Sequence, residues 1–259
     1  MLYNKYLKMH LKIASQYKAN MLFIALSQSI ITIGEILAVF VLFKNFQTVA
    51  GWGFYEAALM FALITTSYSV SECFARGFDE FDKLVRSGEL DRLLVRPVNI
   101  VFQVFVSKIE FTKLFRVIIG LIVGIIAIAN LAIVWTFTKV LVLIAAFVCG
   151  IVVIFSTFLI AAGVAVFTIE KMEAVNIFTN GAKEICYYPL NLYPKWLTRI
   201  CTFIIPLACF NYLPISYIME VGSVPPILCA LSPVLGILFI IPCLLFFLWS
   251  LKKYNSTGN

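Results

Sequence analysis

The sequence has few of the residues from which metal and catalytic sites are built. It contains one histidine, His10, and its seven cysteines stand apart, without a CxxC pair or a Cys/His cluster. Zinc, haem and iron–sulfur sites therefore lack ligands at useful spacing. Because most of the cysteines lie inside apolar runs, we expect them to act as small buried hydrophobic residues.

Motifs for hydrolysis are also missing. The sequence has no GxSxG, no HExxH, no Ser/His/Asp set and no GxxxxGK[ST] phosphate-binding loop. Asp79, Glu80 and Asp82 form a carboxylate cluster, but Lys83 and Arg86 lie beside them, which is typical of a solvated or docking face. We therefore expect a non-catalytic chain without a cofactor or metal, so that any ATP and Mg²⁺ are bound by another chain.

Charge is scarce as well. Charged residues make up 13% of the chain, against about 25% in soluble domains, and the mean hydropathy is +1.00. A membrane span needs ~20 apolar residues, so 259 residues leave room for six spans and no sizeable soluble domain. The positive-inside rule explains the net charge of +7 better than nucleic-acid binding does. We predict an all-α membrane protein with six transmembrane helices.

The first twenty residues have the pattern of an amphipathic helix. Leu2, Tyr6, Met9, Ile13 and Tyr17 fall on one stripe at helical spacing, and Lys5, Lys8 and Lys12 fall on the opposite face. A basic amphipathic helix directly before a span is typical of an interfacial helix in the headgroup layer of the membrane. Residues 1–20 are therefore predicted to bind membrane lipid.

Hydrophobic runs predict five spans, at about 21–43, 55–75, 117–134, 140–167 and 227–249. The remaining span lies between 170 and 220, where two readings compete. Hydropathy alone prefers about 200–219. The other reading places the span at about 174–188 and lays the Pro-rich segment 189–220 into the far surface of the membrane. Both give six spans and put both termini on one side.

That side carries most of the basic residues. Lys5, Lys8, Lys12 and Lys18 lie on it, as do Lys252 and Lys253 and the cluster between Arg76 and Arg116. Six of the thirteen acidic residues and eight of the twenty Lys/Arg residues fall in this cluster. Positive-inside counting makes the side cytoplasmic. Charge is costly in hydrocarbon, so the cluster should contact water or a protein partner.

The polar segment 76–100 is predicted to form two short helices. Phe78, Phe81 and Val85 share one helical face, Gly88 interrupts the helix, and Pro97 ends the turns that follow. A membrane protein that concentrates charge in one loop is expected to work through that loop.

Further positions stand out within the spans. Glu35 lies near the middle of the first span, beside Gln28 and Thr32. Two interpretations stay open: these residues form a substrate pathway or proton relay, or Glu35 is a structural carboxylate bonded to a neighbouring span. We expect Glu72 to pair with Arg76 one turn later. The Gly120-xxx-Gly124 pattern permits close approach of helices and could also serve dimerisation.

The run from Gly88 to Asn99, Gly-Glu-Leu-Asp-Arg-Leu-Leu-Val-Arg-Pro-Val-Asn, resembles a family signature. It is similar to the G-E-L-D-x-L-L-x-R-P-x-N loop of bacterial ATP-binding-cassette permeases of the type-2 export class. Gly51-Trp52 followed by Glu56 resembles the same family, as does the proline pattern Tyr188-Pro, Tyr193-Pro, Trp196, Pro206 and Leu213-Pro214. Together these features cover most of the chain in the expected order.

The resemblance implies a permease subunit of an ATP-driven exporter, multi-pass in the bacterial cytoplasmic membrane with both termini cytoplasmic. The loop between spans two and three would be the coupling helix that docks on a separate ATPase, which holds ATP and Mg²⁺. Short outer-leaflet helices would precede span six, which favours the fifth span at 174–188. The implied coupling residues are Phe78, Phe81, Asp82, Arg86, Gly88, Glu89, Leu90, Asp91, Arg92, Arg96 and Pro97.

The family also implies partners. Its members usually combine two permeases with ABC ATPase subunits, so a second, paralogous permease is expected, and a nucleic acid is not. Family substrates vary among antimicrobial peptides, drugs and lipids, and nothing in the sequence selects one. The rival hypothesis is a proton-coupled secondary transporter that uses Glu35 and needs no ATPase.

Overall fold

The computed structural model describes residues 2–168, 173–222 and 224–255 of the chain. These residues are almost entirely helical, and in place of strands they contain a single isolated bridge between Val49 and Trp52. The first half contains α1 (Leu2–Gln16), α2 (Lys18–Phe46), α3 (Phe54–Asp79), α4 (Phe81–Arg86), α5 (Glu89–Leu94), α6 (Ile100–Ser107), η1 (Phe111–Lys113) and α7 (Leu114–Asn130). The second contains α8 (Phe137–Thr168), α9 (Glu173–Ile185), η2 (Leu190–Leu192), α10 (Lys195–Arg199), η3 (Ile200–Ile204), α11 (Leu207–Phe210), α12 (Tyr212–Met219), α13 (Pro226–Ile237) and α14 (Ile240–Lys252).

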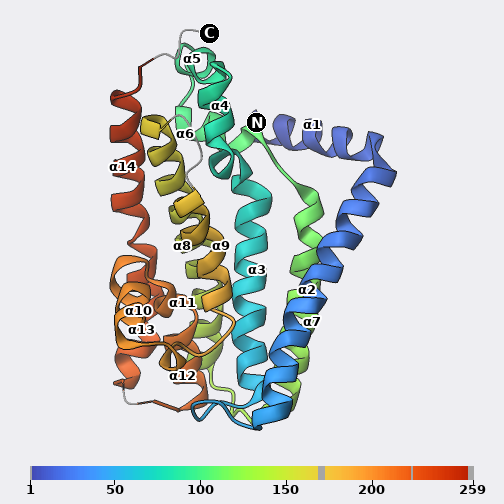
Figure 1. Cartoon of the computed structure of the whole chain (residues 1–259), viewed down its shortest axis with the longest axis vertical. Coiled ribbons are helices and arrows are strands. Elements are labelled where there is room, and N and C mark those ends of the chain that lie inside the picture. The colour runs from blue at the N-terminus through green and yellow to red at the C-terminus, as the bar shows by residue number, and fades with distance from the viewer. Residues whose placement is uncertain (1, 169–172, 223, 256–259) are drawn as a thin grey trace.

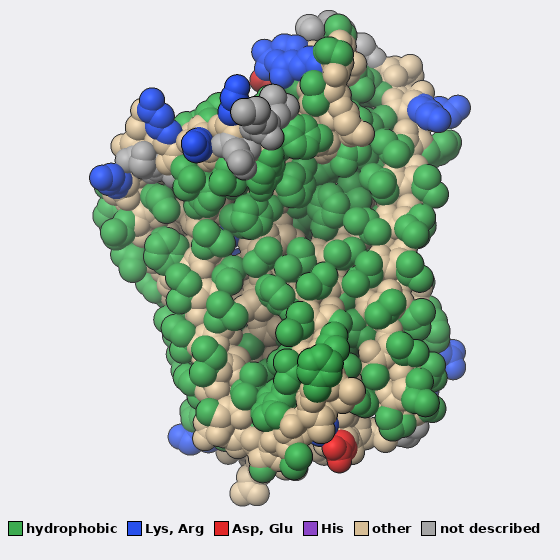
Figure 2. Space-filling view, turned by 180° about the vertical axis from the view of Figure 1, so that it is seen from behind, with side chains coloured by type: hydrophobic (Ala, Val, Ile, Leu, Met, Phe, Trp, Pro, Cys, Tyr) green, Lys and Arg blue, Asp and Glu red, His purple; other side chains and the backbone are tan. Residues whose placement is uncertain are grey.

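Five helical stretches of the described residues are long and apolar enough to cross a membrane: Lys18–Phe46, Phe54–Arg86, Phe111–Asn130, Phe137–Thr168 and Pro226–Lys252. The predicted all-helical membrane fold is thereby confirmed. Figure 1 shows α1 and the C-terminal end of α14 at the same end of the bundle as α4 and α5. Seen from behind, the body between the two charged ends is a broad hydrophobic surface (Figure 2).

The third stretch begins earlier than the sequence predicted. We expected a span at 117–134, whereas the helical stretch covers Phe111–Asn130. The difference arises because Lys113 and Arg116 are buried inside the bundle rather than exposed at its end. Their positive charges are paired there with Glu72, so the helix can begin before them.

α3 is the central helix. The most apolar part of the α3–α4 stretch is 89% buried, whereas the corresponding parts of α2 and of the last stretch are 17% and 22% buried. α7 packs closely on α3, because a Cβ at Gly120 would lie 2.7 Å from Cγ2 of Thr66 and one at Gly124 would lie 3.2 Å from Cβ of Ala62. The Gly120-xxx-Gly124 pattern therefore serves helix packing within this chain.

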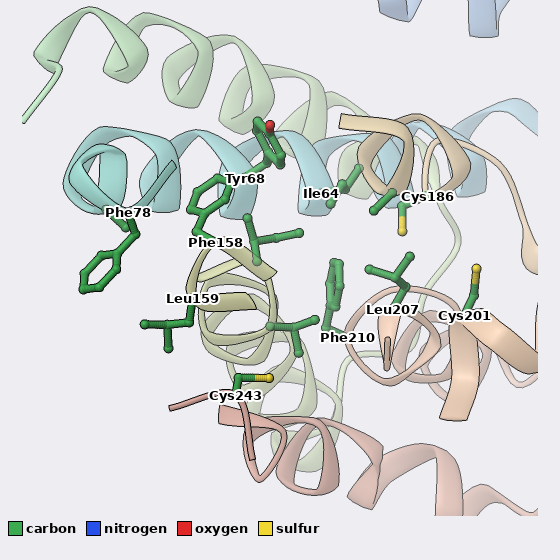
Figure 3. Close-up of a cluster of buried hydrophobic side chains, with 14 of the residues drawn as sticks. Ile64, Tyr68, Phe78, Phe158, Leu159, Cys186, Cys201, Leu207, Phe210 and Cys243 are labelled. Atoms are coloured by element: carbon green, nitrogen blue, oxygen red, sulfur yellow. The ribbon is translucent and has the colours of Figure 1, made fainter. Parts of the chain in front are cut away.

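α8 packs on another side of α3 through matched polar contacts. The hydroxyl of Ser67 donates to the carbonyl of Phe147 at 3.3 Å, and that of Ser71 donates to the carbonyl of Ile151 at 2.9 Å. Both pairs are one helical turn apart, so the two helices run in register. Phe158, Leu159 and Phe210 extend this contact into the hydrophobic core shown in Figure 3. All seven cysteines are buried and free, as expected of small hydrophobic residues.

The segment 191–220 leaves one end of the bundle and returns to it. At its start, the Asn191 side chain donates to the carbonyl of Ala50, in the turn between α2 and α3, at 3.1 Å. At its end, Glu220 accepts a hydrogen bond of 2.7 Å from Lys139, in the first turn of α8. Between them, Lys195–Ile204 and Leu207–Met219 meet at an angle of 76°. Figure 1 places α10, α11 and α12 at the end opposite α4 and α5.

Residues 200–219 are therefore part of a bent pair of helices and not one straight span, and α9 as the fifth membrane segment stays a prediction. α9 lies against α3 and α8, in the body of the bundle. The side chains of residues 171–178, which include Lys171 and the start of α9, lie outside the described residues. The Lys139–Glu220 pair has an electrostatic consequence at the same end, because its hydrogen bond holds the pKa of the Glu220 carboxyl below the usual range.

A cysteine at position 195 tests this topology. Lys195 is exposed in α10, and the native cysteines are buried, so background labelling should be low. We expect Lys195→Cys to react with a membrane-impermeant maleimide added outside intact cells, and Lys83→Cys, at an exposed position of α4, to react only after permeabilisation. Labelling of Lys195→Cys solely after permeabilisation would place segment 200–219 as the crossing helix instead.

Candidate functional site

The charged loop consists of two short helices with a break between them. Gly88 separates α4 from α5 and has a φ of 69°, a left-handed conformation that glycine adopts without a Cβ clash. Asn99 then caps α6 by accepting a hydrogen bond of 2.8 Å from the amide of Val101. The positions of Gly88 and Pro97 as breaks agree with the sequence pattern.

The inner face of the loop is fixed to the bundle by aromatic packing. The rings of Phe78 and Phe81 both pack edge-on against Phe247 of α14, with centroids 5.4 Å apart, and Phe78 also contacts Phe155 of α8 at 5.3 Å. Phe78, Phe81, Val85 and Leu90 are fully buried. Among the predicted coupling residues, Phe78, Phe81 and Leu90 therefore cannot touch a partner in this conformation, and Phe78 and Phe81 join the loop to α8 and α14 instead.

The outer face of the loop is where a partner could bind. Glu89, Arg92, Arg96 and Pro97 are exposed, while Gly88 and Asp91 are half-exposed. Asp82 is buried and bonds to the exposed Arg86 at 2.7 Å. The structure thus divides the predicted set into an anchoring group and a surface group.

Leu94, Val95 and Val98 form an apolar tip on this surface that was not predicted from the sequence. Val95 is 86% exposed, and Leu94 and Val98 are exposed beside it. A signal was present, because Leu93, Leu94 and Val95 follow one another in a helix, and three consecutive side chains cannot all point inward. An apolar tip rimmed by Glu89, Arg92 and Arg96 is an ordinary composition for a protein interface.

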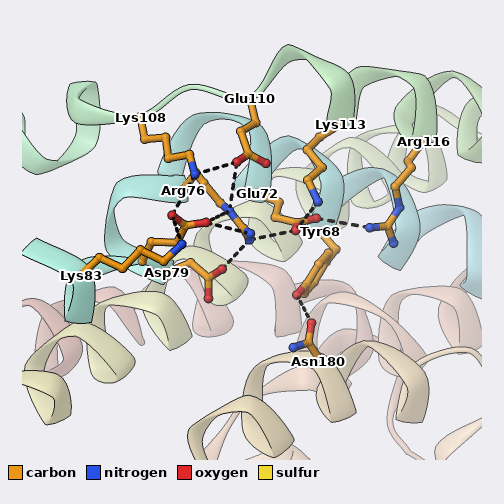
Figure 4. A network of polar contacts seen from close by, with 11 residues as sticks. Tyr68, Glu72, Arg76, Asp79, Lys83, Lys108, Glu110, Lys113, Arg116 and Asn180 are labelled. Atoms are coloured by element: carbon orange, nitrogen blue, oxygen red, sulfur yellow. Dashed lines mark hydrogen bonds and ion pairs between the residues drawn. The ribbon is translucent and has the colours of Figure 1, made fainter. Parts of the chain in front are cut away.

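An ion cluster lies directly beneath the loop (Figure 4). Arg76 contacts Glu72 at 3.1 Å, as predicted, and also Asp79 at 2.5 Å, Glu80 at 3.1 Å and Glu110 at 3.4 Å. Lys108 bonds to Glu80 at 2.8 Å and to Glu110 at 3.0 Å. Burial alone lowers the pKa of Lys108, but its hydrogen bonds to Glu80 and Glu110 raise that pKa above the ordinary value.

Glu72 links this cluster to α7. Its carboxylate accepts a hydrogen bond from Lys113 at 2.6 Å and another from Arg116 at 3.3 Å, and all three side chains are buried. The Arg116 guanidinium lies 5.9 Å from the centroid of the Tyr68 ring, and the Tyr68 hydroxyl donates to Asn180 of α9 at 2.7 Å. The end of α3 is therefore bonded to the loop and to both α7 and α9.

Glu35 is paired with α9. Its carboxylate accepts hydrogen bonds from the Lys183 ammonium at 2.6 Å and from the Tyr187 hydroxyl, just beyond α9, at 2.8 Å. These bonds agree with the interpretation of Glu35 as a structural carboxylate bonded to another helix, and they compensate the charge of the buried Lys183. The described hydrogen bonds of Glu35 do not include Gln28 or Thr32. The Thr32 hydroxyl donates to the backbone carbonyl of Gln28 within α2 instead.

Comparison with known proteins adds to this geometry. A family model described as ABC-2 family transporter protein matches residues 29–258, which contain Glu35, the charged loop and α3 to α14. No curated relative matches the chain significantly. The matched family is one of membrane permeases, generally non-catalytic, that associate with ABC ATPases. With the apolar helices of the fold and the match over most of its length, the chain belongs to the ABC-2 family of transporter proteins as a multi-pass membrane permease.

Proposed function

We propose that the chain is the permease subunit of an ATP-driven exporter in a bacterial cytoplasmic membrane, coupled to a separate ATPase through α4 and α5. The two-faced loop is the observation that carries this proposal. One face is locked to α8 and α14 by Phe78 and Phe81, and the other presents the exposed tip around Val95. ATP and Mg²⁺ are held by the partner ATPase, because the sequence has no phosphate-binding loop.

A push on the loop would be transmitted rather than absorbed. The loop is joined to α3 by the Arg76 cluster and to α14 by aromatic packing. α3 in turn packs on α7 and α8 along most of its length. Movement of the bound ATPase would therefore displace these helices together, which is a rigid-body form of conformational coupling.

The translocation path is proposed to lie on the α2–α9 side, between this subunit and a second, paralogous permease. α2 is the least buried of the five long helical stretches, and its 29 residues are more than enough to cross the membrane. On α9, the exposed Asn180 and Glu184 lie one turn apart. An exposed carboxylate at membrane depth must face water or protein rather than lipid tails, so this side fits a cavity with the half-exposed Glu35 and Gln28 near its wall. The third predicted pathway residue, Thr32, is fully buried in this conformation.

One prediction of the proposed function concerns the tip of the loop. Val95→Asp should reduce binding of the partner ATPase at least tenfold, because it introduces charge at the centre of the proposed interface, where single residues can contribute ~2 kcal/mol or more. The measurement is co-purification of the ATPase with the permease and permease-dependent ATP hydrolysis in proteoliposomes.

Val134→Asp is the matched control. Val134 is a valine of similar exposure, 76%, in the connection between α7 and α8 at the other end of the bundle. It should leave both measurements unchanged. Normal ATPase binding by Val95→Asp would show that the docking surface lies elsewhere.

Another prediction concerns Glu35 and separates the two transport hypotheses. Glu35→Gln leaves the buried Lys183 ammonium without its carboxylate, so thermal stability should fall, because breaking a buried ion pair on one side costs about 3–5 kcal/mol. Glu35→Gln combined with Lys183→Met removes both charges and should recover most of that stability.

In an ATP-driven exporter the double variant should retain permease-dependent ATP hydrolysis within a few-fold, and collapse of the proton gradient should leave that activity unchanged. In a proton-coupled carrier the double variant has lost its titrating group. Transport that continues without ATP and disappears in a folded double variant would establish the carrier and overturn the exporter.

A further inference from the structure

A groove follows the inner side of the bend between α1 and α2. Its first part, a hollow of about 410 Å³, lies among His10 of α1, Asn20 and Met21 of α2, and the segment Lys108–Thr112. Its second part, a hollow of about 490 Å³, is lined by Lys18, Met21, Ala25, Ser29 and Phe115. Met21 lines both, so the two hollows are adjacent, and we name them together the elbow groove.

The two parts of the elbow groove differ in chemistry. The upper part carries His10, Asn20, Lys108 and Glu110, whereas the lower part is lined by Lys18 and runs between α2 and α7 over Met21, Ala25 and Phe115. Figure 1 shows α1 meeting the start of α2 at a sharp bend. With α1 in the headgroup layer and α2 in the hydrocarbon, the groove passes from headgroups to tails.

Charge selects the headgroup. Lys18 and Lys108 line the groove, and the first 34 residues contain no Asp or Glu. The one carboxylate that lines the groove, Glu110, is bonded to Arg76 and Lys108 and is therefore neutralised. The mouth of the groove is positive overall, which attracts anionic lipid at about 1 kcal/mol for each basic residue near the surface.

We propose that the elbow groove binds one anionic phospholipid of the cytoplasmic leaflet. Its phosphate lies at Lys18 and the mouth of the upper hollow, and an acyl chain follows the lower hollow between α2 and α7. Each hollow has a volume within the range of about 300–1,000 Å³ of small-molecule sites. The site uses residues before position 29, which the family match does not cover. It rests on the cytoplasmic placement of α1 in the proposed function and not on ATP-driven export.

The bound lipid would touch both sides of a contact that holds α1 to the loop region. His10 Nε2 donates to the carbonyl of Val106 in α6 at 3.0 Å, and the Tyr3 ring lies 6.4 Å from that of Phe105. Lys108 and Glu110, on the opposite wall, belong to the ion cluster beneath the loop. Occupancy of the groove therefore fixes α1 against the element that follows the coupling loop, and it should raise the thermal stability of the subunit.

Native mass spectrometry of the purified, delipidated full-length chain tests the site. Phosphatidylglycerol should bind as a single tight copy and raise the melting temperature, whereas phosphatidylcholine at the same concentration should do neither. Lys18→Gln should weaken phosphatidylglycerol binding about fivefold, as expected for one basic residue at the headgroup. Ala25→Trp and Ser29→Phe fill the lower hollow and should abolish the tight copy. Two such variants are used because either one alone could fail to fold.

The matched controls lie on the same helices outside the groove. Lys5→Gln removes an exposed charge of α1, and Ile30→Trp places a large ring on the exposed side of α2. Both should bind phosphatidylglycerol like the unmodified chain. Equal weakening by Lys5→Gln and Lys18→Gln would mean unspecific adsorption to basic surface. Equal binding of phosphatidylcholine, or tight binding retained by a folded groove-filling variant, would also overturn the proposal. None of these measurements involves the ATPase, so they can fail independently of the exporter assignment.

Discussion

The structure depends on one constraint: a charge inside an apolar helix bundle needs an opposite charge close to it. Two buried sets satisfy it. Glu72 of α3 is shared by Arg76, Lys113 and Arg116, and Glu35 of α2 is paired with Lys183 of α9. Each set connects helices that are distant in sequence. Because separating the charges leaves one of them uncompensated, these pairs fix which helices are neighbours in a bundle whose apolar surfaces would accept other arrangements.

The same constraint gives the charged loop its mechanical character. An exposed loop of mixed charge would normally be mobile, since surface ion pairs contribute little. Here the cluster around Arg76 is partly buried and lies between α3, Glu80 at the start of α4, and Glu110 before α7. The rings of Phe78 and Phe81 fix the other side. The loop is thus a rigid extension of the bundle, which is what a coupling element requires if partner movement is to reach the membrane helices.

The sequence predicted those features that depend on local pattern. Runs of apolar residues predicted the long helices, and Gly88 and Pro97 predicted where the helices of the loop end. Spacing gave the Glu72–Arg76 pair, since residues four apart on a helix are neighbours. Spacing along the chain could not predict that Glu110 pairs with Arg76 or that Lys183 pairs with Glu35, because these pairs form only after distant segments pack together. It also grouped buried Phe81 with exposed Arg92, because proximity in a motif does not tell which face of a helix is covered.

The topology that we propose takes α9 as the fifth membrane segment, although hydropathy alone prefers residues 200–219. Residues 200–219 are more apolar than α9, yet both ends of segment 191–220 are bonded to the same end of the bundle. Asn191 donates to the carbonyl of Ala50 at one end, and Glu220 accepts from Lys139 at the other. Burial accounts for part of the apolarity of residues 200–219, since Cys201, Leu207 and Phe210 belong to the core, whereas Phe203 is exposed. α9 carries Lys183 and Glu184, but Glu35 offsets the lysine, and a side facing a cavity would accept the glutamate. Hydropathy reports what surrounds a helix, so a helix with internal charge partners can occupy the membrane while a more apolar segment turns back.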